Sequence, residues 1–346
     1  MPAMRTPLIV GWLLAGLVAA SGCAPLAVAG VSASTDPQQA APTAEVAGAA
    51  VDAPPSVRAS TRSAPGRLVA VGDLHGDLAA TRRVLRLVGA VDEDDRWVGG
   101  DLTVVQVGDQ TDRGPDERAV LDLLHRLEGE AAAAGGQLVV LHGNHELMNV
   151  AFDFRYVPAN GWTDFETPDV LAEAEALEEG ELGVPLETLP EGRRGRYLAF
   201  RPGGPYARRL APHDVVAIVG DTLFVHGGVL PVHVEHGLDR LNAETRAWLL
   251  SEGPRPEVLR GPDSPVWSRH YSNDTDADDC ALLEEVLDRL GLARMVVAHT
   301  VQGGGITAAC SERVWRVDVG LSAHYGGPTQ ALEILPDGVR VLEAPD

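Results

Sequence analysis

Three short apolar segments of this chain each end in a cluster of polar residues, and this repeated arrangement strongly constrains the fold. The segments are Leu68–Gly72, Leu102–Gly108 and Gln137–His142, which have the length and composition of buried strands. Helical patterns lie between them, at Asp77–Val88 and at about Pro115–Ala134. The order β-α-β-α-β predicts an α/β fold.

The second half of the chain adds further strands to this pattern. They are predicted at Val215–Val219, Thr222–Val225, Arg294–Ala298, Val314–Val319 and near Ala331–Leu335. Residues 151–212 show no strong strand pattern and include an acidic, helix-like stretch at Asp169–Glu179. We therefore interpret residues 151–212 as an insertion that covers one face of the fold.

Two segments at the start of the chain differ from the rest. Leu8–Ala20 is almost wholly apolar and is followed by small residues and Cys23, which is typical of a secretory signal. It also resembles a bacterial lipoprotein signal, in which the cysteine carries the lipid. A membrane anchor is the alternative, but the apolar run is shorter than the roughly 20 residues that span a bilayer. Residues 24–66 lack aromatic residues and periodicity, which is typical of a flexible tether.

These segments predict the domain organisation and the location of the protein. We expect a signal or lipoprotein leader at residues 1–23, a tether at residues 24–66 and a folded domain at residues 67–346. The leader predicts export to the periplasm or the cell surface, with membrane attachment where Cys23 is lipidated.

Composition excludes several classes of protein. The chain has 28 Lys plus Arg and 50 Asp plus Glu, a net charge of −22, which disfavours a general nucleic-acid binder. A hydrophobic fraction of 45% supports a sizeable core and excludes wholesale disorder. The three cysteines, Cys23, Cys280 and Cys310, are too few for a disulfide scaffold. Cys280 and Cys310 could pair in an oxidising compartment, or could lie too far apart to do so.

The polar clusters carry the candidate chemistry of the chain. They are GDLHGD at 72–77, GDQTDRG at 108–114 and GNHE at 143–146, each directly after a predicted strand. His226 and His299 also follow predicted strands. Because ligands of α/β proteins bind outside the carboxyl ends of the strands, we expect these clusters to converge in space.

The residue types in these clusters suit divalent metal ions. Carboxylate, amide and imidazole ligands together favour Mn, Fe or Zn. A carboxylate can bridge two cations about 3.5–4 Å apart, which can hold the attacking and leaving oxygens of an in-line displacement. A single Asp or His at a strand end would be a cap or a turn residue, but six in five clusters indicate a site. The candidate ligands are Asp73, His75, Asp109, Asn144, His226 and His299.

The polar clusters of the sequence resemble those of a known family. The GDLHGD, GDQTDRG and GNHE runs, with the two later histidines, are similar to the calcineurin-like metallophosphoesterase superfamily. The Arg of GDQTDRG and the His-Glu of GNHE resemble its phosphoprotein phosphatase branch, and Asp318–Ser322 resembles the bacterial or Shewanella-like phosphatases. The resemblance covers most of Arg67–Gly327. It implies a β-sandwich flanked by helices with an inserted cap-like segment, and makes residues 67–346 the catalytic domain.

The resemblance also implies which residues hold which metal. The first metal would be held by Asp73, His75 and Asp109. The second would be held by Asp109, Asn144, His226 and His299. Asp109 would therefore bridge the two ions.

Other residues are assigned to catalysis by the same resemblance. His145 resembles the general acid that protonates the leaving oxygen, and Asp112 is similar to the carboxylate that orients it. Arg113 resembles a phosphate clamp, because a planar guanidinium can contact two oxygens at once. Arg269 is similar to a second phosphate-binding arginine, with Arg260 as a nearby alternative.

We therefore expect a dinuclear-metal phosphatase that hydrolyses phosphomonoesters by direct attack of a metal-bound hydroxide. Its substrate would be a phosphoprotein, with phosphate on Ser/Thr or Tyr, or a small phosphomonoester, and no nucleic-acid partner is expected. A diadenosine-tetraphosphatase-like nucleotide hydrolase is one alternative, which the negative net charge disfavours. A non-catalytic, metal-containing surface lipoprotein is another. Asp112, Arg113 and His145 oppose it, because a structural metal site needs neither a proton donor nor a phosphate clamp.

Overall fold

The computed structural model describes residues 61–64, 66–173, 177, 188–336 and 338–344. The chain divides into two compact units, Met1–Val51 and Asp52–Asp346, and every described residue lies in the second. The expected leader and most of the expected tether lie outside the described residues. Within the part of the chain that is described, no helix is both long enough and apolar enough to cross a membrane.

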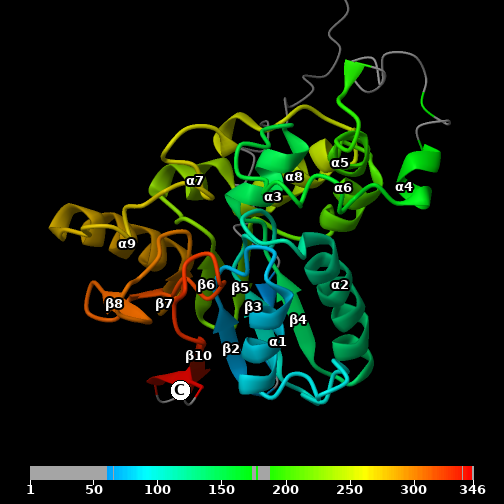
Figure 1. Cartoon of the computed structure of the whole chain (residues 1–346). Coiled ribbons are helices and arrows are strands. Elements are labelled where there is room, and N and C mark those ends of the chain that lie inside the picture. Colours follow the sequence, from blue (N-terminus) through cyan, green and yellow to red (C-terminus); the bar gives the residue numbers. More distant parts are fainter. Residues whose placement is uncertain (1–60, 65, 174–176, 178–187, 337, 345–346) are drawn as a thin grey trace, which may run out of the picture. The chain divides into compact units, whose positions relative to one another are not determined.

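Two mixed β-sheets form the centre of the second unit (Figure 1). The first has the order β11-β10-β2-β3-β4, from β2 (Leu68–Val71), β3 (Thr103–Gln106), β4 (Gln137–Val140), β10 (Gln330–Leu335) and β11 (Gly338–Glu343). The second has the order β1-β5-β6-β7-β9-β8, from β1 (Thr61–Arg62), β5 (Val216–Val219), β6 (Thr222–Val225), β7 (Arg294–Val297), β8 (Thr307–Ala309) and β9 (Val314–Arg316). β2, β3 and β4 run parallel, as do β6, β7 and β9, so their carboxyl ends point the same way within each sheet.

The two faces of each central strand pack into different apolar clusters. Leu68 and Ala70 of β2 join the layer between the sheets, together with Phe224 of β6. Val69 and Val71 of β2 join the cluster on the outer face of the first sheet. Because successive side chains of a strand point to opposite faces, a strand covered on both sides needs an unbroken apolar sequence. This is why the central strands could be located in the sequence.

Helices cover the outer faces of both sheets, so the predicted helix-flanked β-sandwich is confirmed. The first sheet is covered by α1 (Leu78–Leu87) and α2 (Glu117–Ala133), and the second by α7 (Pro231–His236), α8 (Leu238–Leu249) and α9 (Ala277–Leu290). α1 begins after Asp77, whose carboxylate accepts a hydrogen bond from the Ala80 N–H at 2.8 Å.

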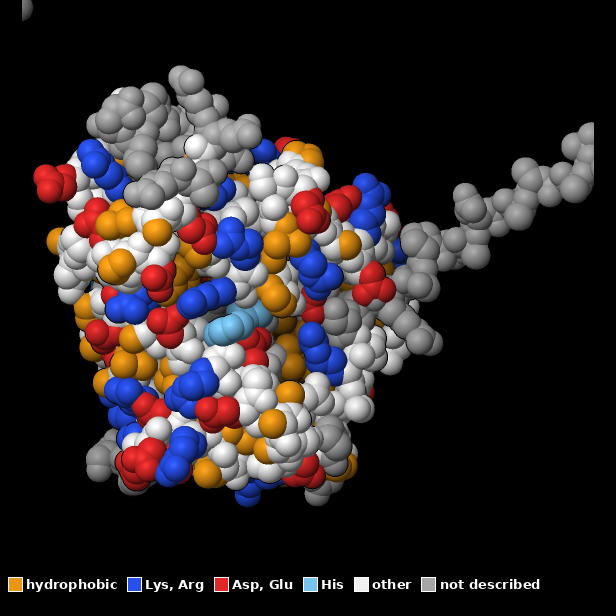
Figure 2. Space-filling view, turned by 90° about the vertical axis from the view of Figure 1, so that its right-hand side faces the viewer, with side chains coloured by type: hydrophobic (Ala, Val, Ile, Leu, Met, Phe, Trp, Pro, Cys, Tyr) orange, Lys and Arg blue, Asp and Glu red, His pale blue; other side chains and the backbone are white. Residues whose placement is uncertain are grey.

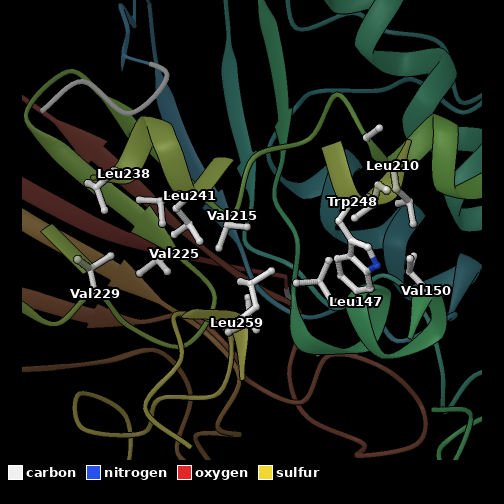
Figure 3. Close-up of a cluster of buried hydrophobic side chains, with 14 of the residues drawn as sticks. Leu147, Val150, Leu210, Val215, Val225, Val229, Leu238, Leu241, Trp248 and Leu259 are labelled. Carbon is white, nitrogen blue, oxygen red and sulfur yellow. The ribbon is translucent and has the colours of Figure 1, made fainter. Parts of the chain in front are cut away.

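The described part of the insertion at residues 151–212 is helical and contains no strand. Its helices are α4 (Pro168–Ala172), α5 (Arg194–Phe200) and α6 (Pro205–Leu210). Figure 3 shows Leu210 of α6 beside Trp248 of α8, with Leu147 and Val150 of α3 (Asn144–Val150) close by. The insertion is therefore joined through apolar packing to the helix that begins with the third polar cluster. Of the stretch predicted as helix from residue 169, residues 174–176 and 178–179 lie outside the described residues.

Three strands of the structure are absent from the sequence prediction, and all three lie at sheet edges. β1 falls within the expected tether, where Thr61 pairs with Ile218 and Arg62 with Val219 of β5. β8 and β11 form the far edges of the second and first sheets. An edge strand has one neighbour and one open side, so it can form without the continuous apolar run of a central strand.

Charged residues of both signs are mixed on the surface that carries α2. Figure 2 shows acidic side chains interspersed with basic ones, all of which are arginines because the chain has no lysine. Asp122 of α2, for example, pairs with Arg118 and with Arg209 of the insertion. On this face arginine side chains therefore neutralise part of the negative charge of the acidic side chains. Such exposed pairs contribute little to stability.

The structure joins Cys280 and Cys310 in a disulfide, one of the two outcomes that the sequence left open. Their Cα atoms lie 5.3 Å apart, and the bond links α9 to the turn between β8 and β9. A disulfide fits an oxidising compartment, the environment expected for an exported protein.

Candidate active site

The polar clusters after the parallel strands meet, and the candidate metal ligands lie close together. His226, which follows β6, places Nε2 3.1 Å from Asp109 Oδ2 and 3.1 Å from Asn144 Oδ1. His75 Nε2 lies 3.7 Å from Asp73 Oδ2 and 3.9 Å from Asp109 Oδ2. The carboxyl ends of strands from both sheets thus supply one buried group of side chains.

Asp109 lies at the centre of this group. Two sets of three residues could each hold a metal ion, because the candidate ligand atoms within each set lie within 4.8 Å of one another. Both sets include Asp109. They are His75, Asp109 and His145, and Asp109, His226 and His299. A carboxylate shared by two sets has the position that a bridging ligand requires.

The backbone at several of these residues adopts a conformation that favours glycine. His75 has φ 47°, Asp109 has φ 55° and His299 has φ 68°. Left-handed conformations of non-glycine residues cost of order 1–3 kcal/mol each and cluster at functional sites. The surrounding structure fixes these turns, and each turn carries a side chain of the site.

The residues present fit divalent cations, because several buried oxygen and nitrogen atoms here have no hydrogen-bond partner among the described residues. Asp73 Oδ1, Asp318 Oδ2 and His299 Nε2 are buried without a hydrogen-bond partner among the described residues. Burial, and then the nearby carboxylates of Asp318 and Asp109, raises the pKa of Asp73 well above its ordinary value. Burial likewise raises the pKa of Asp318. A bound cation would balance these charges and use the free oxygen and nitrogen atoms.

His145 and Asp112 form a buried hydrogen-bonded pair beside Asp109. His145 Nδ1 lies 2.6 Å from Asp112 Oδ2, and His145 Nε2 lies 3.8 Å from Asp109 Oδ2. Burial lowers the pKa of His145, but the carboxylates of Asp109 and Asp112 outweigh it and raise that pKa to about 9. The imidazole is therefore held with one nitrogen on Asp112 and the other toward the candidate ligands.

Glu146 holds the second polar cluster in its conformation. Its carboxylate accepts hydrogen bonds from the backbone N–H groups of Asp109, Gln110 and Thr111 at 2.8–3.0 Å. It also accepts from the Gly143 N–H at 2.9 Å and the Thr111 hydroxyl at 2.9 Å. The sequence contains Glu146 in the GNHE motif, but only the structure shows that it fastens two clusters together.

Arg113 lies against an aromatic ring that comes from the insertion. Its guanidinium carbon is 4.0 Å from the centre of the Tyr156 ring, and its backbone N–H donates to Tyr156 O at 3.2 Å. The same ring lies 5.1 Å from that of His145. The Arg113 Nε atom is buried without a hydrogen-bond partner among the described residues. Tyr156 therefore holds the candidate phosphate clamp next to the candidate acid.

The two alternatives for a second phosphate-binding arginine have different surroundings in the structure. Arg269 donates to the Thr300 hydroxyl at 2.7 Å and to His299 O at 3.5 Å, so it lies beside a candidate ligand. Arg260 is exposed and pairs with Glu257 at 3.0 Å. Arg269 therefore lies next to the candidate ligand His299.

Two residues that contact the site, Arg196 and Tyr325, carry no clear signal in the sequence. Arg196 of α5 is fully buried and donates to Asp112 Oδ1 at 3.0 Å. It lies in a run of similar arginines, Arg193, Arg194 and Arg196, which gives no signal that one of them is buried. Tyr325 places its ring 5.3 Å from that of His75. Its position after the last predicted site segment could be explained equally well by a turn.

Residues 66–303 match the family model described as calcineurin-like phosphoesterase. The chain is 41% identical over 304 residues to Shewanella-like protein phosphatase 2 of Arabidopsis thaliana, which covers 80% of this chain and 78% of that protein. It is 26% identical over 276 residues to Shewanella-like protein phosphatase 1 of Plasmodium berghei, which covers 76% and 70% respectively.

Solved structures give a matching fold. The cold-active protein-tyrosine phosphatase of a psychrophilic Shewanella sp. aligns with a TM-score of 0.62 and 24% identity, over 83% of each chain. At this level of identity the match shows a shared fold and nothing about the substrate.

The close approach of Gly143 to Asp109 gives a test of the site geometry. A Cβ at Gly143 would overlap Asp109 Oδ1 and the Asp109 backbone nitrogen. We expect Gly143→Ala to displace Asp109, to lower metal content measured by elemental analysis, and to cost about 1–3 kcal/mol in denaturant unfolding. Gly129→Ala is the control, because Gly129 lies in α2 with open space around it and alanine favours a helix there. Unchanged metal content in Gly143→Ala would contradict the central position of Asp109.

Proposed function

The chain belongs to the calcineurin-like phosphoesterases and is a phosphoester hydrolase, and on this basis we propose that it uses two divalent metal ions to dephosphorylate proteins. One observation carries the proposal. The His145–Asp112 pair and the Arg113–Tyr156 stack meet beside Asp109, which both sets of ligand atoms share. A metal site with only a structural role would need neither of these additions.

The two metals would be held by the residues that the sequence analysis named. Asp73, His75 and Asp109 would hold the first, and Asp109, Asn144, His226 and His299 the second. Carboxylate, amide and imidazole ligands suit Mn, Fe or Zn. Such ions, when bound, neutralise a phosphate dianion and lower the pKa of water.

The chain's own residues would supply proton transfer and phosphate binding. The protonated imidazole of His145 carries a proton on each nitrogen. The Asp112 carboxylate would accept a hydrogen bond from Nδ1, and the Nε2 proton would pass to the leaving oxygen, which leaves a neutral imidazole. His145 also belongs to one of the two sets of candidate ligand residues, and the hydrogen bond between its Nδ1 and Asp112 favours the role of an acid. Arg113 and Arg269 would bind the phosphate oxygens from two sides of the site.

Variants of Asp109 and His145 test this division of roles. Asp109→Asn should lose metal as well as activity, because a neutral amide cannot balance two cations. His145→Asn should keep its metal and its fold. Its rate should fall by about 10²–10⁴-fold on phosphates with poor leaving groups, the range for a lost general acid. On an activated aryl phosphate the loss should be smaller, because the leaving group needs less protonation.

Steady-state rates and metal analysis of the same preparations provide the measurement for both variants. Equal losses on both kinds of phosphate, or loss of metal in His145→Asn, would show that His145 is not the acid.

A phosphoprotein substrate is supported by the relative that is 41% identical, whose name is Shewanella-like protein phosphatase 2. The negative net charge also disfavours polyanionic nucleotides. With added Mn²⁺, we expect phosphopeptides to be hydrolysed with a higher kcat/KM than diadenosine tetraphosphate. A panel of phosphoserine, phosphothreonine and phosphotyrosine peptides and nucleotides measures this. A preference for the dinucleotide would replace the protein phosphatase proposal with the nucleotide hydrolase alternative.

We also propose that the protein is exported and attached to a membrane through lipidated Cys23. The apolar run before Cys23 supports the proposal, and a disulfide in the folded unit fits the same compartment. Cys23→Ala should move the protein from the membrane to the soluble fraction without lowering the activity of the folded domain. Wild-type protein that keeps its full leader in the cytosol would contradict export.

A further inference from the structure

We propose that Arg196 is a positioning residue for His145, delivered to the active site by α5 of the insertion. The inference rests on the proposed function, because it assigns to Arg196 a part in the proton transfer given to His145. Arg196 contacts none of the candidate metal ligands and would not contact the substrate. It would act through Asp112, which it contacts directly and through Asn149.

The guanidinium of Arg196 is buried and makes five hydrogen bonds. Nη2 donates to Asp112 Oδ1 at 3.0 Å and to Glu117 Oε2 at 2.6 Å. Nη1 donates to Glu117 Oε1 at 3.0 Å and to Gly161 O at 3.1 Å, and Nε donates to Asn149 Oδ1 at 2.9 Å. Such a fork holds its partners in one fixed geometry.

These bonds determine which oxygen of Asp112 is left for His145. Asn149 Nδ2 donates to Asp112 Oδ1 at 3.1 Å, the oxygen that Arg196 also contacts. Asp112 Oδ2 then remains for His145 Nδ1 at 2.6 Å. Two donors on Oδ1 prevent the carboxylate from rotating, so the imidazole is held at one angle. Arg196 thus fixes the acid through one intermediate residue.

Three aromatic rings surround the guanidinium of Arg196 and restrict its position. Its guanidinium carbon lies 5.2 Å from the ring centre of Phe165, 5.3 Å from that of Phe200 and 5.8 Å from that of Phe154. All three rings come from the insertion. Glu117 Oε2 also accepts the Asp112 N–H at 3.0 Å, which ties the backbone of Asp112 to the same network.

A role in stability alone is a weaker explanation of this arrangement. A buried ion pair contributes little net stability compared with apolar residues of similar volume. Glu117 by itself would neutralise the charge of Arg196, yet the arginine also reaches Asp112, the partner of the proposed acid. Positioning accounts for this second contact.

The test compares two kinds of phosphate in a double-mutant cycle. Arg196→Met alone would leave Glu117 buried without its partner and could fail to fold. The compensated variant Arg196→Met with Glu117→Gln removes one charge of each sign. Arg193→Met is the matched control, because Arg193 is exposed just before α5 and stacks on Trp162 at 4.2 Å.

We expect the compensated variant to keep its metal content and to lose about 10- to 100-fold in rate on phosphates with poor leaving groups, as for other outer partners of catalytic groups. The loss should be smaller on an activated aryl phosphate. In the His145→Asn background the same change should cost nothing further, because both act on one step. Arg193→Met should match wild type. If the compensated variant does not fold, Arg196→Lys enters the cycle, since it keeps the charge but cannot form the fork.

Additive losses in the cycle, equal losses on both phosphates, or loss of metal would overturn the role of Arg196. Failure of the proposed function gives a different result. In that case wild-type protein hydrolyses neither phosphate, or His145→Asn shows no dependence on the leaving group, and the inference fails with it. When wild-type protein hydrolyses both phosphates and the loss in His145→Asn depends on the leaving group, only the role of Arg196 is under test.

Discussion

The buried carboxylate of Asp109 is the constraint on which the rest of the site depends. Asp109 Oδ1 accepts a hydrogen bond from the backbone N–H of His145 at 3.0 Å, and Asp109 Oδ2 lies 3.1 Å from His226 Nε2. Glu146 holds the backbone of Asp109, and Gly143 leaves the space that a Cβ would fill. The turns after β3 and β4 and the histidine after β6 can therefore adopt their positions only around this side chain. A buried carboxylate is tolerated because it is surrounded by donors and by sites for cations.

The fold balances buried negative charge in two ways. The inner carboxylates, Asp73, Asp109 and Asp318, lie close together, and burial raises the pKa of Asp73 and Asp318, so a bound cation would relieve them. The outer carboxylates, Asp112 and Glu117, already have a permanent partner in an arginine of the insertion. An arginine keeps its charge at any working pH, whereas a metal can leave. Arg196 therefore balances Asp112 and Glu117 without a bound cation.

The sequence was enough to locate the central strands and the candidate ligands at their ends. It was not enough to locate features that depend on tertiary packing. The central strands are buried on both faces, so their apolar runs are unbroken, and the candidate ligands follow at their ends. The edge strands β1, β8 and β11 lack that signal. Arg196 looks like its neighbours Arg193 and Arg194 in the sequence, and only the packing of α5 decides which of them is buried. Arg269 and Arg260 could be separated only when their partners were known, Thr300 for the first and Glu257 for the second.

The origin of each residue suggests how chemistry and positioning are divided in this chain. Every candidate metal ligand follows a strand of the sandwich, so the ligand set depends on the sheets. Two residues that hold the candidate acid and clamp, Arg196 and Tyr156, come instead from the insertion. Leu210 of α6 shares one apolar cluster with Leu147 and Val150 of α3, the helix that begins with Asn144 and His145. Substitutions in the insertion would therefore change the surroundings of Asp112 and Arg113 while the candidate metal ligands remain in place.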